Sequence, residues 1–287
     1  MPRRVAPALD ERRGLLRWDG RAGLVRHEVA SPRWRAPPLL LAVVADLHVA
    51  APWTSLEAVR GLVARVNALD PDLVLLPGDF TADGRLRLPA RVPPPEAVAE
   101  ALAPLRAPLG AFAVLGNHDW ASDPEALATG HRSTAIGRAL AARGIRLLSN
   151  EAAPLPGGAW LVGIDSQRGH LGLGEGKGRD DLEVAFASVP PGAPAILMAH
   201  EPDVFARADP RAVLQVSGHT HGGQANLLGW RPLTPSAFGG RYAWGHLVEG
   251  AGERERHLVV SGGVGYSGVP LRVAQPPEIT LIALSRG

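Results

Sequence analysis

Two histidines separated by a single threonine, His219 and His221, stand between glycines in the stretch 217–224. The apolar segment 212–216 precedes them and is typical of a buried strand. Side chains at positions i and i+2 of an extended chain point to the same face, so both imidazoles can reach one point. Neutral histidine is a common metal ligand and can also transfer protons. Taken alone, the pair fits either a metal site or a partly exposed turn.

Other apolar segments of the chain also end near polar residues that can bind metals. The residues that closely follow the segments 39–45, 73–76, 110–115 and 195–199 are Asp46 with His48, Asp79, Asn117 with His118, and His200. Each has another explanation, because aspartate caps helices, asparagine forms turns and a buried histidine can be satisfied within the core. The repeated order of strand, polar loop and helix predicts a layered α/β protein whose ligands gather at the carboxyl ends of the strands.

The candidate donors are carboxylates, one amide oxygen and imidazoles. The sequence contains no cysteine, which excludes thiolate metal sites, disulfides and cysteine nucleophiles. A mixed set of nitrogen and oxygen donors suits Mn, Fe, Zn, Co or Ni, with Mn or Fe favoured, whereas oxygen donors alone would indicate Mg or Ca. The set is large enough for two divalent or trivalent ions, which together can make a hydroxide nucleophile and bind both the attacking and the leaving oxygen.

Taken in order, the motifs at 46–48, 78–79, 116–119, 200 and 218–221 resemble those of the calcineurin-like metallophosphoesterase family. The resemblance implies an α/β fold with four layers, a sandwich of two facing mixed β-sheets flanked by helices. It also implies a dinuclear metal site at the carboxyl ends of the strands. The implied activity is hydrolysis of a phosphoester.

The same resemblance assigns roles to single residues. The implied metal ligands are Asp46, His48 and His221 for one ion and Asn117, His200 and His219 for the other, with Asp79 bridging both. His118 would not be a ligand but would stabilise or protonate the leaving oxygen, and Asp119 would orient His118. In this hypothesis a metal-bridging hydroxide attacks the phosphorus in line, and no covalent enzyme intermediate is needed.

Three stretches, 218–224, 263–267 and 276–279, resemble a narrower group, the bacterial phosphodiesterase branch of the family. Some of its members cleave the pyrophosphate of a UDP-2,3-diacylglucosamine lipid precursor, and many carry an N-terminal membrane anchor or export signal. A phosphodiesterase is therefore the expected activity, with hydrolysis of such a lipid pyrophosphate as an alternative. A non-catalytic interaction protein on the same fold is a further, less favoured alternative.

Composition limits the partners. The formal net charge is +2, with 46% hydrophobic and 20% charged residues, as in ordinary soluble globular proteins. No basic tail suggests a specific nucleic-acid partner. The family resemblance implies a small-molecule phosphoester as the partner, with a lipid-linked phosphoester as an alternative. The longest early apolar segment, 39–45, is too short to span a bilayer. We expect a cytoplasmic protein with at most peripheral contact at the inner face of the membrane; its oligomeric state is not indicated.

Three arginines near the motifs, Arg132, Arg168 and Arg241, could contact a phosphate or could be solvated surface charges. Residues 1–37 are rich in arginine and proline and are predicted to form an N-terminal extension that packs on a single domain, residues 38–287. Within that extension, 25–29 is expected to be a short edge strand. A glycine-rich loop at 166–178 is expected near the mouth of the site.

Hydrophobic spacing predicts the remaining elements. Helices are expected from Ser55, as N-cap, to 69, at 96–105 and 134–143, and from a cap at Asp180 or Asp181 to 187. The buried face of the first helix should contain Ala58, Val59, Leu62, Val63 and Val66. Further strands are expected at 145–148, 159–164, 258–261 and 279–284.

Overall fold

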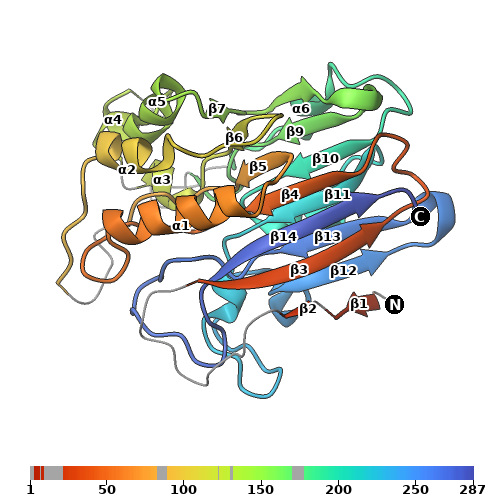
Figure 1. Ribbon diagram of the computed structural model, residues 1–287. Coiled ribbons are helices and arrows are strands. Elements are labelled where there is room, and N and C mark those ends of the chain that lie inside the picture. Colours follow the sequence, from red (N-terminus) through yellow and green to blue (C-terminus); the bar gives the residue numbers. More distant parts are fainter. Residues whose placement is uncertain are drawn as a thin grey trace.

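The computed structural model describes residues 3–6, 8–9, 22–82, 89–121, 123–129, 132–169 and 178–287. Most of the glycine-rich loop expected at 166–178 lies outside these ranges, as does much of the predicted N-terminal extension. The described residues form two seven-stranded sheets with helices on their outer faces (Figure 1).

The first sheet carries the amino-terminal half of the motifs. Its strand order is β2 (Ala8–Leu9), β3 (Gly23–Ala30), β14 (Glu278–Ser285), β4 (Leu39–Val43), β5 (Leu73–Leu76), β6 (Ala111–Ala113) and β7 (Arg146–Leu147). The strands β4, β5, β6 and β7 are parallel to one another. Next to them β14 runs antiparallel to β4 and parallel to β3. The sheet is therefore mixed.

The second sheet carries the remaining motifs. Its strand order is β1 (Arg3–Val5), β12 (Gly245–Glu249), β13 (Arg256–Val260), β11 (Ala212–Ser217), β10 (Ala195–Met198), β9 (Trp160–Gly163) and β8 (Glu151–Pro154). The strands β9, β10, β11 and β13 are parallel, and β8, β12 and β1 pair antiparallel with their neighbours. This sheet is mixed as well.

The helices lie outside the sheets. They are α1 (Leu56–Ala68), α2 (Pro95–Leu102), α3 (Asn117–Ala121), α4 (Pro124–Ala128), α5 (Ala135–Ala142) and α6 (Leu182–Phe186). Short 3₁₀ helices are η1 (Pro156–Gly158), η2 (Pro202–Arg207), η3 (His221–Gly223), η4 (Gly239–Tyr242) and η5 (Gly252–Arg254). In α1 the Ser55 hydroxyl accepts the Ala58 N–H at 3.1 Å, which confirms the predicted cap. The side chain of Ala58, however, is exposed, because it lies on the solvent side of α1.

Alternation along the central strands explains the layers. In β5, Leu73 and Leu75 point into the core between the two sheets, while Val74 and Leu76 point toward α1, α2 and α5. On the other side of the molecule, β9 and β10 pack their outer face against α6 and η2. Strands covered on both faces read as continuous apolar runs, which is why their sequences do not alternate. The predicted αββα sandwich is confirmed (Figure 1).

One strand differs in position from its prediction. The segment expected as an edge strand at 25–29 is the longer β3, which lies between β2 and β14. It pairs with β14 from Gly23 to Ala30, and the nearby Trp34 is fully buried and donates its Nε1–H to the Pro37 carbonyl at 2.9 Å. The edge position is therefore wrong, because the two residues of β2 pair with Val25 and Arg26 on the side of β3 opposite β14.

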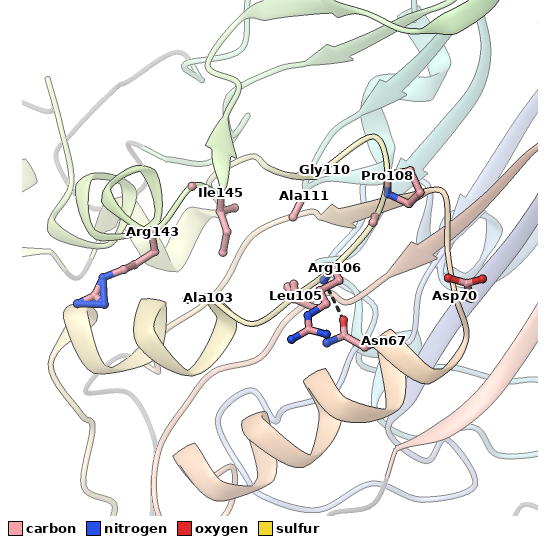
Figure 2. A pocket seen from close by; sticks show the side chains of 12 residues that line it. Asn67, Asp70, Ala103, Leu105, Arg106, Pro108, Gly110, Ala111, Arg143 and Ile145 are labelled. Carbon is pink, nitrogen blue, oxygen red and sulfur yellow. Dashed lines mark hydrogen bonds between the residues drawn. The ribbon is translucent and has the colours of Figure 1, made fainter.

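A cavity of about 570 Å³ lies among the ends of α1, α2 and α5 (Figure 2). It is lined in part by Asp70, Gly110 and Ile145, which precede β5, β6 and β7. Ligand sites in sheets of this kind form at the carboxyl ends of the strands. This cavity is at the amino ends, and no candidate metal ligand lines it. In the part of the chain that is described, no helix is both long and apolar enough to cross a membrane.

Candidate metal centre

The two sheets bring their polar motifs to one place. Turns after β4, β5 and β6 carry one group of candidates, and turns after β10 and β11 carry the other. Three sets of side chains there have ligand atoms within 4.8 Å of one another: Asp46, His48 and His221; His48, Asp79 and His118; and Asp79, His200 and His219. All of these residues except the half-buried His118 are buried. Residues from five separate turns therefore form one cluster.

Asp79 joins the two halves of the cluster. Its Oδ2 lies 3.3 Å from His48 Nε2 and 3.2 Å from His200 Nε2. On one side, His48 Nε2 lies 3.1 Å from His221 Nε2. On the other side, His200 Nε2 lies 3.2 Å from both His219 Nδ1 and the Asn117 amide oxygen. The carboxylate of Asp79 thus occupies the central position between two groups of donors.

Backbone carbonyls set the tautomers of two of the histidines. His200 Nδ1 lies 2.6 Å from the Pro77 oxygen. His219 Nε2 lies 3.1 Å from the Pro235 oxygen. Because a carbonyl only accepts, these nitrogens donate their hydrogens, and the opposite nitrogens of the neutral rings present lone pairs. The two lone pairs face each other beside a carboxylate and an amide oxygen. Such a set of acceptors repels itself unless a cation lies among them, so the site fits metal ions.

The pKa values in the cluster show that the Asp79 carboxylate attracts positive charge. Burial alone would raise the pKa of Asp79, but the charge of His200 and hydrogen bonds hold it well below its usual value. Burial opposes protonation of His200, yet the Asp79 carboxylate raises the pKa of His200 well above the ordinary histidine value. Burial and neighbouring positive charge lower the pKa of His219 and of His221, which keeps both imidazoles neutral. In the metal-free chain the cation beside Asp79 is therefore the proton on His200, which a metal ion would replace, while the neutral His219 and His221 are suitable ligands for borderline metal ions.

The turns that carry the candidates are strained. Non-glycine residues with left-handed backbone are Asp46 (φ 53°), His48 (φ 40°), Asp79 (φ 57°), His219 (φ 69°) and His221 (φ 51°). Each such conformation costs roughly 1–3 kcal/mol and persists only where the surrounding structure enforces it. Strain of this kind is concentrated at functional sites. Here it aims each donor inward directly from the end of its strand.

Close backbone approach holds the halves together. The N–H of His219 donates to both oxygens of Asp46, at 2.8 and 3.1 Å, which ties the turn after β11 to the turn after β4. Beside this contact, a Cβ on Gly218 would lie 2.7 Å from Asp46 Oδ2. A side chain at position 218 would collide with this buried carboxylate, so the position requires glycine.

His118 lies at the open side of the cluster. Its N–H donates to Asp79 Oδ1 at 2.9 Å, and its ring lies edge-on to that of His48 with centroids 5.0 Å apart. The buried donors lie behind it. A side chain in this position can meet both the cluster and a group that arrives from solvent.

Asp119 makes contacts that the sequence did not suggest. Its Oδ2 accepts the N–H groups of Asp79 and Gly116, both at 2.8 Å. Its Oδ1 accepts the N–H of Phe80 at 2.9 Å. Burial, with Asp79 close by, raises the pKa of Asp119 to about 6. These bonds fasten the turn after β5 to the turn after β6, and so hold the backbone that presents Asp79.

Arg168 reaches the cluster from the 166–169 turn. Its Nη1 lies 3.2 Å from His219 Nε2. The buried Glu201 holds this turn, since its carboxylate accepts the Ser166 hydroxyl at 2.5 Å and the Gln167 N–H at 3.0 Å. Of the three arginines considered for phosphate contact, Arg168 is therefore the one that lies beside the candidate metal centre. The other two are exposed, and Arg241 pairs with Glu249.

Sequence reasoning missed a buried arginine behind the cluster. Arg272 donates to the carbonyls of Gly262 and Gly265, each at 2.6 Å, and its Nη2 lies 3.1 Å from His221 Nδ1. Burial lowers the pKa of Arg272 to about 10, so the guanidinium stays charged at neutral pH. The available signal was a lone cation between apolar residues in the 269–273 segment. It had no partner visible in sequence, because the acceptors are backbone carbonyls.

Replacing Arg272 with methionine should lower the free energy of unfolding by about 3 kcal/mol or more, because several buried carbonyls lose their donor. Chemical denaturation of the metal-loaded protein measures this. Arg241→Met removes an exposed arginine and should change stability by less than about 0.5 kcal/mol. Equal effects of the two substitutions would contradict the structural role of Arg272.

Comparisons with known proteins agree with this geometry. A family model for calcineurin-like phosphoesterases matches residues 39–223. A transmembrane protein with a metallophosphoesterase domain from Danio rerio is 31% identical over 260 residues, which is 86% of this chain and 53% of that protein. The uncharacterized metallophosphoesterase YkuE of Bacillus subtilis is 30% identical over 83% of this chain and 76% of its own length.

A third relative has a more specific name. The UDP-2,3-diacylglucosamine pyrophosphatase LpxG of Chlamydia trachomatis is 27% identical, over 85% of this chain and 83% of its own length. The family match includes every turn that contributes to the cluster, from Asp46 to His221. The chain therefore belongs to the calcineurin-like phosphoesterase family, as its motifs predicted.

Proposed function

We propose that the protein is a phosphodiesterase that uses two metal ions, with manganese or iron favoured. The proposed ligands are Asp46, His48 and His221 for one ion and Asn117, His200 and His219 for the other, with Asp79 shared. The observation that carries this proposal is the central Asp79 carboxylate, within 3.3 Å of nitrogen donors from both groups. A shared carboxylate between two donor sets is the arrangement that a two-metal hydrolase requires.

When bound, the two ions would supply Lewis acidity and an activated water. The chain supplies position and proton transfer. Asn117 and His118 are half-buried and leave the cluster open on their side, so a phosphate can enter there. His118 is proposed to donate a proton to the leaving oxygen. Asp119 is proposed to act through the backbone, because its carboxylate holds the turn of Asp79.

Arg168 is proposed to bind a non-bridging phosphate oxygen, since its guanidinium already lies beside His219. It also lines a cavity of about 360 Å³, together with Gln167, Asp203 and Phe238. Arg168 and Pro235 line this cavity and also contact His219, so we propose that the cavity receives one substituent of the phosphodiester. A cytoplasmic location is part of the same proposal.

A second candidate is the hydrolysis of a lipid-linked pyrophosphate. The name of the Chlamydia relative favours it. The cavity beside Arg168 combines a cation with the aromatic wall of Phe238 and so can accept an amphiphilic group. The chemistry at the metals would be the same for both candidates.

The test is reconstitution of metal-free protein with manganese, iron, zinc, cobalt or nickel, followed by assays on two chromogenic esters. Bis-para-nitrophenyl phosphate should be hydrolysed faster than para-nitrophenyl phosphate with manganese or iron bound. Calcium serves as the control ion, because it prefers oxygen ligands and should give no turnover. Preference for the monoester would refute the diesterase assignment, and metal binding without any turnover would favour an interaction protein.

A further inference from the structure

The segment 225–238 lies directly against the metal centre. The Pro235 carbonyl accepts His219 Nε2–H at 3.1 Å, and Arg231 donates to the Gly222 carbonyl. Further along, the Ser236 hydroxyl donates to Asp203 at 2.5 Å. The inner side of the segment is thus fastened to the turn that carries the histidine pair.

The outer side of the same segment is apolar and exposed. Its exposed large hydrophobic residues are Leu227, Leu228 (107% exposed), Trp230 (66%), Leu233 (65%) and Phe238. The segment 266–273 lies beside it, because Asn226 N–H donates to the Val273 carbonyl and Val273 N–H to the Gln224 carbonyl, both at 2.9 Å. This second segment adds exposed Val269 and Leu271. Apolar exposure concentrated on adjoining segments marks a contact surface rather than ordinary scattered exposure.

The tip of the surface is strained in a way that folding does not explain. The chain reverses between Leu227 and Trp230, whose backbones exchange hydrogen bonds of 2.8 and 3.1 Å. Leu228, within this turn, has a left-handed backbone with φ 55°. Asparagine or glycine is the usual residue in that conformation, because a branched apolar side chain gains nothing there. A fully exposed leucine in a strained turn is accounted for by a contact outside the molecule.

Charge identifies the partner. The segments 225–238 and 266–273 contain no aspartate or glutamate, and each contains one arginine, the half-buried Arg231 and the buried Arg272. A surface that combines leucines and an exposed tryptophan with the half-buried Arg231, and has no acidic residue of its own, matches the interface of an anionic bilayer. Tryptophan in particular favours the headgroup level, where its ring is apolar and its N–H is solvated.

We propose that residues 225–238, with 266–273 beside them, form a membrane-docking surface that inserts Leu228 and Trp230 into an anionic lipid bilayer. The inference rests on the proposed phosphoesterase function, and it adds the membrane surface as the place where the enzyme binds its substrate. Since the inner side of the segment contacts His219, docking places the metal centre at the level of lipid headgroups. The substrate class that follows is a phosphoester carried by a membrane amphiphile.

The experiment measures co-sedimentation of the full metal-loaded chain with vesicles. Vesicles of equal parts phosphatidylcholine and phosphatidylglycerol are compared with phosphatidylcholine alone. The wild type should bind the anionic vesicles more strongly. The double variant Leu228→Asn with Trp230→Ser, which adds no charge, should bind at least about tenfold more weakly. Val184→Asn, at a side chain 57% exposed on α6, is the matched control: it also removes an exposed apolar side chain without adding charge, and it should bind as the wild type does.

Melting temperatures check that the variants are folded, and Leu228→Asn should not lower stability, because asparagine tolerates the left-handed backbone. Equal binding of the wild type and the double variant, or no vesicle binding by the wild type, overturns the proposal. A third outcome would also overturn the proposal. If the wild type self-associates with rising concentration but does not bind vesicles, and only the double variant loses this self-association, the surface contacts a second copy of the chain. Turnover of the soluble diester by the wild type tests the proposed function separately, without vesicles.

Discussion

Replacing His118 with alanine is expected to lower kcat by about 10²–10⁴-fold, the usual contribution of a positioned general acid. The reason is its position. The half-buried ring of His118 lies at the mouth of the cluster, edge-on to the ring of His48, and the buried donors lie behind it. The loss should be largest for diesters with an alkoxide leaving group, which needs a proton. It should be smaller for para-nitrophenolate, which leaves readily without one.

The dependence on the leaving group separates proton donation from a structural role. Metal content, measured by elemental analysis, should remain at the wild-type level in His118→Ala. Because His118 also lies within 4.8 Å of His48 and Asp79 ligand atoms, loss of metal is the informative failure. It would make His118 a ligand rather than an acid. An equal loss with both kinds of leaving group would also contradict the assigned role.

Replacing Asp79 with asparagine is expected to have the largest effect on metal binding, weakening it by more than about 100-fold. The substitution removes the one negative charge placed between His48 and His200, so the two ions would lose the charged ligand that they share. Titration calorimetry with manganese measures the affinity, and activity should disappear with it.

A matched control is Asp72→Asn, at a carboxylate that accepts the Leu40 N–H at 2.7 Å near the amino ends of the strands. It should leave metal affinity unchanged. If Asp79→Asn bound two ions as tightly as the wild type, the bridging assignment would be wrong. The metal-free wild type should also unfold more easily than the loaded protein, since ligands that bind only the native state stabilise it.

Much of the site could be predicted because its residues stand at the ends of strands that are apolar on both faces. The continuous apolar sequence of a segment such as Leu73–Leu76 predicts a buried strand, and the polar residue that closely follows each such strand is then a candidate for the site. Parallel strands deliver their ends to one edge, so Asp79 and Asn117 could be grouped without knowing any distance. The resemblance to a family then implied the four layers of the fold and the proposed role of each candidate residue.

What the sequence did not predict depends on contacts distant in the chain. The bonds of Asp119 go to backbone N–H groups, and those of Arg272 go to backbone carbonyls, so neither has a partner that residue types reveal. The strand β12, Gly245–Glu249, escaped notice because its glycine and polar ends obscure the apolar pattern. The left-handed backbone of the candidate ligands was not predicted either, because glycine is the residue that usually indicates this conformation, whereas histidine and aspartate do not.

The position of β14 has a consequence for synthesis of the protein. Residues 278–285 pair on one side with β3 and on the other with β4, the strand that leads to Asp46. While the polypeptide emerges from the ribosome, β3 and β4 therefore present unpaired edges, and the first sheet cannot close. Open edges of apolar strands invite aggregation, so the nascent chain should depend on chaperones until its last strand has been made. Because β14 supports the strand that ends at Asp46, we expect the proposed metal site to be completed only after β14 has been made.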